Sequence, residues 1–207
     1  MNHRRPACKI FFWILKLLLL TQSSLLWAAD SVALVSSAEG ILKGLTEPIV
    51  GMHHLVFCLM TGFLGLTMAK SYRYPLFYLF TLIPGYAVAF YLPLPVIFVN
   101  VVVALSVAAL LFNLWFVEKF GRYAVLILTL GGFFHGASFV QTVQGSSMTG
   151  LLSYLIAATL IQALLCFGFG LFTLRLSLKS LDNLEGLENI LSATATGVFI
   201  AYIYMAF

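Results

Sequence analysis

The chain alternates between long apolar runs and short polar breaks. The breaks hold charged residues, prolines and glycines, which stop burial and mark turns. Each run is near the ~20 residues that a helix needs to cross the hydrocarbon of a bilayer, and none alternates residue by residue as a membrane strand would. The pattern therefore predicts six spanning helices, near residues 48–69, 74–92, 95–117, 123–143, 149–174 and 189–206.

The composition agrees with this pattern. Hydrophobic residues make up 62% of the chain and charged residues 9%, whereas a soluble domain is roughly 45–50% apolar and about 25% charged. We therefore expect an all-α protein, a polytopic membrane helix bundle of six transmembrane helices over residues 29–207, in contact with the lipid bilayer. A nucleic-acid partner is not expected, because the basic residues form no stripe.

The first 28 residues read as a signal peptide. Arg4, Arg5 and Lys9 form a basic start, an apolar stretch follows, and small residues precede Asp30. We expect cleavage after Ala28, and an uncleaved anchor helix is the alternative. Both interpretations place Asp30 outside the cytoplasm.

The charges between the spans give an orientation. When the chain starts outside at Asp30 and crosses at each span, six of the seven basic residues after the signal peptide fall on the cytoplasmic side. These are Lys70, Arg73, Lys119, Arg122, Arg175 and Lys179. Since cytoplasmic loops carry the excess of Lys and Arg, we expect the mature N-terminus and the C-terminus both to lie outside, in the periplasm.

Three histidines, His53, His54 and His135, lie inside predicted spans. An ionisable side chain in the membrane is costly and usually marks a functional site. At 1.5 Å per residue, His53 and His54 lie ~8–9 Å below the outer end of the first span, and His135 lies ~9–12 Å below that of the fourth. The matched depth indicates a shared site for a cation or a proton.

Small and polar residues recur at helical spacing on three spans. Glu47, Gly51, His54 and Cys58 share one face if the first helix begins at Pro48. The fourth and fifth spans carry similar stripes: Gly131, His135, Ser138 and Thr142, and Thr159, Gln162, Cys166 and Gly170. Such stripes are most often packing surface between helices, and we expect the three to face one another.

Imidazole nitrogens suit nickel, copper, zinc and iron. His54 and His135 are the expected inner ligands, with Glu47 near the outer mouth. The full set of candidate metal ligands is His54, His135, His53, Glu47, Gln141 and Ser138. So sparse a site suits a transported ion better than a closed four-ligand site does, and we expect no permanently bound cofactor.

The first motif resembles one of the HupE/UreJ family of hydrogenase and urease accessory membrane proteins. The family pattern is His-Pro-x-x-Gly-x-Asp-His at the start of the first mature span. Pro48, Gly51 and His54 match this pattern, while Glu47 replaces the first His and His53 replaces the Asp.

A second motif lies in the fourth span, where the family carries Phe-His-Gly. Phe134, His135 and Gly136 match it, and Gln141 stands where members often carry Glu. The resemblance implies a permease for Ni²⁺ or Co²⁺ in the inner membrane of a bacterium, serving metalloenzyme maturation. Maturation proteins or further copies of the chain are the implied protein partners.

Alternatives to the permease remain. The altered motif positions fit a degenerate, non-transporting accessory or scaffold subunit. A metal-dependent membrane enzyme is the third possibility, and we do not expect it because such enzymes need more ligands and an acid or base. The sequence holds no Gly-x-x-x-x-Gly-Lys-Ser/Thr motif for ATP, so uptake would be secondary or driven by the membrane potential.

Overall fold

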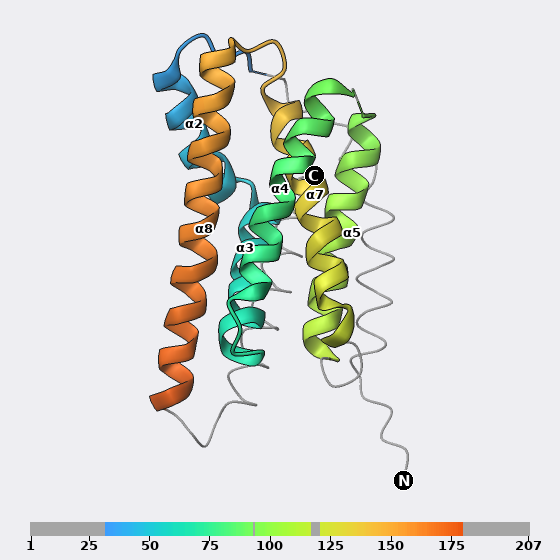
Figure 1. Cartoon of the computed structure of the whole chain (residues 1–207), viewed down its shortest axis with the longest axis vertical. Coiled ribbons are helices and arrows are strands. Elements are labelled where there is room, and N and C mark those ends of the chain that lie inside the picture. The colour runs from blue at the N-terminus through green and yellow to red at the C-terminus, as the bar shows by residue number, and fades with distance from the viewer. Residues whose placement is uncertain (1–31, 93, 117–120, 180–207) are drawn as a thin grey trace.

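The structure is a computed structural model that describes residues 32–92, 94–116 and 121–179 (Figure 1). These residues form helices and connecting turns: α2 (Ser37–Val50), α3 (Met52–Gly62), α4 (Arg73–Tyr91), α5 (Val96–Trp115), α7 (Ala124–Thr142) and α8 (Met148–Lys179). A π-helical segment, η2 (Phe63–Met68), continues α3, and a 3-10 turn, η3 (Gly121–Tyr123), precedes α7. The predicted signal peptide, 1–28, and the predicted sixth span, 189–206, lie outside the described residues.

Four of the predicted spans are confirmed as helices within a few residues. α4, α5, η3 with α7, and α8 are each long and apolar enough to cross a membrane. A fifth crossing is added if the bent pair of helices at residues 37–68 counts as one broken span. The described part of the chain is therefore an all-α bundle of the kind that a multi-pass membrane protein forms.

The prediction that the first span is one helix beginning at Pro48 is wrong. The helix begins at Ser37, where Ser36 and Glu39 form a reciprocal capping box, and Pro48 lies inside its last turn. At Gly51 the backbone leaves the helical region with ψ 88°. The two helices on either side of this residue, α2 and α3–η2, meet at 74°.

Two helix pairs make the most extensive contacts, α4 with α7 and α2 with α8. α2 runs beside the first half of α8, and α3 and η2 contact its second half (Figure 1). α7 also packs on α5. α3 contacts both α8 and α5.

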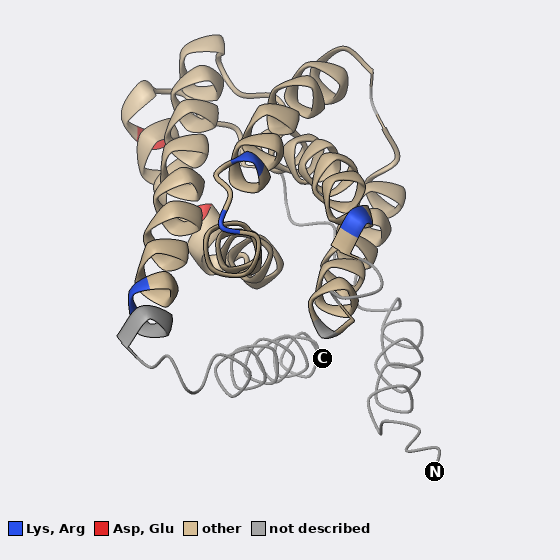
Figure 2. Ribbon diagram, turned by 60° about the horizontal axis from the view of Figure 1, so that its bottom comes forward, with Lys and Arg blue, Asp and Glu red and all other residues tan. Residues whose placement is uncertain are grey.

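The described charges gather at the two ends of the bundle. Lys70, Arg73, Arg122 and Arg175 lie at the starts of α4 and α7 and near the end of α8, and this basic end comes forward in Figure 2. The other end holds Glu39 with Lys43 and Glu47, all on α2, and we call it the acidic end. The basic residues of the described part thus share one end of the bundle, and the orientation in the membrane stays a prediction.

Close backbone contact joins α3 to α8. A Cβ added to Gly62 would collide with the carbonyl oxygen of Cys166, and one added to Gly170 would lie 2.6 Å from the carbonyl oxygen of Gly62. Small residues allow such approach between membrane helices. The glycines therefore set the distance between these two helices.

Substituting Gly62→Ala should loosen this contact, because the new methyl group meets backbone that cannot move aside. We expect a loss of about 1–3 kcal/mol of stability, the usual range for overpacking. Thermal unfolding of purified protein in detergent measures it. Gly168→Ala is the matched control on α8, since a Cβ there meets nothing within 4 Å. Equal stability of the two variants would contradict the close contact.

Candidate metal site

His54 on α3 and His135 on α7 meet inside the bundle. Their Nδ1 atoms are 2.7 Å apart, and the two side chains are 2% and 0% exposed. At this distance the nitrogens share a hydrogen bond, so one Nδ1 carries a proton and the other accepts it. The prediction that two spans bring imidazoles to one level is confirmed.

Ser106 on α5 determines which ring donates. Its hydroxyl donates to the carbonyl oxygen of Val103 at 2.7 Å and lies 3.3 Å from Nε2 of His135. A hydroxyl has one hydrogen, and Val103 takes it. Nε2–H of His135 therefore donates to Ser106, which leaves Nδ1 of His135 with a free lone pair that accepts from His54 Nδ1–H.

Aromatic rings enclose the pair. Phe139, one turn from His135 on α7, stacks on His54 with 4.1 Å between ring centroids. Phe57, on α3, lies 4.5 Å from the His135 ring. His53 lies 4.1 Å from His54 and 6.1 Å from His135. Apolar rings keep water out, so the nitrogen contacts form in a medium of low dielectric constant.

The bend at Gly51 positions His54. The amide of His54 donates to the carbonyl oxygen of Gly51 at 2.8 Å, in the first turn of α3. A Cβ on Gly51 would lie 2.9 Å from Cδ2 of the His54 ring, so the ring packs directly on this residue. The sequence needs glycine here because the imidazole occupies the space of a side chain.

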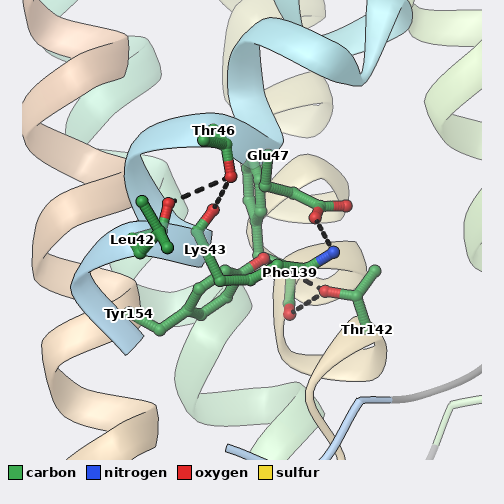
Figure 3. A network of polar contacts seen from close by, with 7 residues as sticks. All are labelled: Leu42, Lys43, Thr46, Glu47, Phe139, Thr142 and Tyr154. Carbon is green, nitrogen blue, oxygen red and sulfur yellow. Dashed lines mark hydrogen bonds and ion pairs between the residues drawn. The ribbon is translucent and has the colours of Figure 1, made fainter. Parts of the chain in front are cut away.

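The prediction that Glu47 and His54 lie on one continuous helix face is wrong, because the bend at Gly51 separates them. Glu47 stays on α2, where it pairs with Lys43 at 2.7 Å (Figure 3). Beside it, Tyr154 donates to Thr142 at 3.0 Å. Glu47 is therefore held near the acidic end and does not join the imidazoles.

Two further predicted ligands have other partners. The Ser138 hydroxyl donates to the carbonyl oxygen of His135, 2.8 Å away on its own helix. Gln141 donates through Nε2 to the carbonyl oxygen of Leu94 at 3.0 Å, while its buried Oε1 has no hydrogen-bond partner. Within the described ranges, no group of three or more His, Cys, Asp and Glu side chains is arranged to hold a metal ion. The arrangement offers two imidazoles, with a third ring beside them.

The expectation that the three polar stripes face one another is confirmed in part, because side chains of the first stripe contact each of the other two. His54 bonds to His135, and Cys58 on α3 donates to Gln162 on α8. Sequence reasoning missed Ser106 and the enclosing rings. A lone hydroxyl in the most apolar span was the only signal for Ser106.

Comparison with known proteins gives one result. The sequence matches the protein family described as HupE / UreJ protein over residues 17–201. No curated protein and no solved structure gives a significant match. The matched region contains all of the described helices.

Removing the Ser106 hydroxyl should allow His135 to change its tautomer. In Ser106→Ala the Nε2–H loses its acceptor, which costs about 1–3 kcal/mol for a buried donor, and a shift of the His135 proton to Nδ1 avoids that cost. The ¹⁵N chemical shifts of the imidazoles measure the tautomers. Ser106→Thr keeps a hydroxyl and serves as the control. Identical ¹⁵N spectra in the wild type and Ser106→Ala would show that Ser106 does not set the tautomer.

Proposed function

The chain belongs to the HupE / UreJ family, and from this premise we propose that it is a membrane permease for Ni²⁺ or Co²⁺. The ion enters from the acidic end and leaves at the basic end, where it supplies the maturation of a metalloenzyme. One observation supports this proposal above the others. Two imidazoles from separate helices meet with their Nδ1 atoms 2.7 Å apart in the interior.

The geometry of the pair suits one transition-metal ion. Two imidazole nitrogens that each bind an ion at about 2.0–2.1 Å lie about 3 Å apart when they occupy neighbouring positions at right angles. The two Nδ1 atoms need to separate only slightly from their hydrogen-bonded distance. His135 already presents its lone pair, since Ser106 holds the proton on Nε2.

His54 is the ring that must change when the ion arrives. Its Nδ1–H fills the hydrogen bond to His135, and a nitrogen that binds metal must give up its proton. The His54 proton moves from Nδ1 to Nε2, so that the ring stays neutral as the ion takes its place between the rings. In the site without an ion, the hydrogen bond joins the two Nδ1 atoms, and a bound ion would take the place of that bond.

Weak binding favours release. The described residues supply no carboxylate to the pair, since Glu47 is held by Lys43. A membrane potential of about 100 mV gives an inward-moving divalent ion ~4.6 kcal/mol, which drives uptake through such a site without a coupled ion.

The test is metal accumulation by cells that express the chain. His54→Ala and His135→Ala should each reduce nickel or cobalt accumulation by about tenfold or more, because one imidazole holds the ion much less tightly than two. Elemental analysis of washed cells measures it, with the amount of protein checked in the membrane fraction. Thr129→Ala is the control on α7, because that hydroxyl bonds only to the carbonyl oxygen of Val125 on its own helix.

Accumulation that stays at the wild-type level in both histidine variants would reject the permease. If the chain then copurified with a maturation protein in the same histidine variants, the accessory-subunit alternative would replace it. Lower accumulation in Thr129→Ala as well would show that the assay reports damage to the bundle rather than loss of a ligand.

A further inference from the structure

Beyond the histidine pair, α3 and η2 continue toward the basic end of the bundle. From His54 to Lys70 the length along these helices is on the order of 20 Å. A cation that crosses this part of the interior needs polar atoms on its way, because an uncompensated buried charge is costly. The proposed permease therefore requires a further polar site between the histidine pair and the basic end.

A buried polar cluster lies at the next helical turn. Cys58 follows His54 by four residues on the same face of α3, about 6 Å further along the axis. Its Sγ atom lies 3.5 Å from the hydroxyl oxygen of Tyr78 on α4 and 3.8 Å from Oε1 of Gln162 on α8. All three side chains are 0% exposed. The ring centroids of Tyr78 and His135 are 6.2 Å apart, so the cluster adjoins the histidine pair.

The side-chain oxygen of Gln162 is the atom on which this cluster converges. The hydroxyl of Tyr78 donates to it, and the thiol of Cys58 donates to it at 3.8 Å. The other end of the amide is anchored, because Nε2 donates to the carbonyl oxygen of Ala158, one turn earlier on α8, at 3.1 Å. The anchored amide therefore holds its oxygen toward α3 and α4.

This oxygen can be freed at little cost. The Tyr78 hydroxyl has a second acceptor within reach, since Sγ of Cys58 is 3.5 Å away. Rotation about the phenolic C–O bond moves the hydrogen from Oε1 of Gln162 to that sulfur. The thiol is a weak donor, so little is lost when its own hydrogen turns away. Gln162 can thus exchange the hydrogens at its oxygen for a cation.

Further polar atoms continue along the same interface. Thr61 follows Cys58 by three residues, on the face of α3 that carries His54. Its side chain is 0% exposed and its hydroxyl has no hydrogen-bond partner, although a threonine on a helix usually bonds to a carbonyl of the preceding turn. Nearer the basic end, the hydroxyls of Thr67 on η2 and Thr173 on α8 are 2.7 Å apart. Polar groups thus extend from the histidine pair toward the basic end.

We propose that Oε1 of Gln162 is an inner ligand for the transported Ni²⁺ or Co²⁺, and that it takes the ion from the histidine pair on the way to the basic end. This inference rests on the proposed permease. Carbonyl oxygens suit harder ions than nickel does, whereas imidazole suits nickel, so the ion is held less tightly here than between the histidines. Conduction needs sites that an ion can both enter and leave. Tyr78 acts through Gln162 as a positioning residue.

The first test removes the oxygen. Gln162→Leu should lower nickel accumulation in cells by about tenfold or more. Purified Gln162→Leu in detergent should still bind Ni²⁺ as the wild type does in isothermal titration calorimetry, because the histidine pair is intact. Thr159→Val is the matched control, since it removes another hydrogen bond between α4 and α8, that of Thr159 with Tyr86 at 3.0 Å. The control should accumulate nickel at the wild-type level.

A second variant keeps an oxygen and adds charge. Purified Gln162→Glu should bind Ni²⁺ about tenfold or more tightly than the wild type, because the charge of the ligands sets the affinity for a divalent ion. A glutamine that only joins helices predicts no such gain. This variant also decides the question if Gln162→Leu does not fold.

Wild-type accumulation in Gln162→Leu, or unchanged Ni²⁺ affinity in Gln162→Glu, would overturn the inner ligand and leave the permease in place. Equal losses of accumulation in Gln162→Leu and Thr159→Val would assign Gln162 to packing and overturn it too. Failure of the permease itself has a different signature, wild-type accumulation in both histidine variants, and it would remove the inner ligand as well.

Discussion

A hydrogen bond between two imidazoles, buried where water cannot replace it, ties α3 to α7. A polar group in such a place is costly unless it has a partner. His54 and His135 are each other's partner, and Ser106 satisfies the remaining nitrogen of His135. These bonds fix α3, α5 and α7 relative to one another. Replacing any one of the three side chains by an apolar one would leave a buried polar partner without its hydrogen bond. The same nitrogens are of the kind that transition-metal ions bind.

The bend at Gly51 allows the His54–His135 contact to form while α2 and α3 both pack against α8. Before the break, Gly40 and Gly44 hold α2 against the first half of α8. After it, Gly62 holds α3 against the second half. Between these contacts the chain bends by 74° at Gly51, and the first turn of α3 beyond the bend carries the His54 ring that contacts His135 on α7. A residue without a side chain at the turn leaves space for the His54 ring.

Hydrophobic patterning predicted α4, α5, α7 and α8 well, because each is a single run of the length that a bilayer requires. It failed at α2, because no predicted span covered residues 37–47, which include the charged Glu39, Lys43 and Glu47. The signals that would have predicted α2 are local features of the sequence. The Ser36 to Glu39 spacing is a capping box, and the spacing of Gly40 and Gly44 is that of a helix-packing motif.

The candidate site was also predictable from the sequence only in part. His54 and His135 were predictable, because imidazoles at equal depth in two spans have few partners other than each other. Glu47 was misplaced because helical spacing was extended through a bend that a proline and a glycine introduce. Ser106 could not be singled out, since a hydroxyl in a span usually bonds to its own helix. Only the tertiary structure shows that its oxygen also accepts from a histidine.

The substitutions in the two family motifs now have a physical meaning. Histidine at 53 and glutamine at 141 are neutral where the family pattern is acidic, and the one carboxylate of the first motif, Glu47, is neutralised by Lys43. In the proposed site, a divalent cation would therefore meet nitrogen lone pairs without the long-range attraction of a negative site. Affinity then depends on the coordinate bonds that an ion forms with imidazole, and these strengthen along the transition series. The proposed site would distinguish transition metals from Mg²⁺ and Ca²⁺, which prefer oxygen ligands, by the chemistry of its bonds rather than by charge.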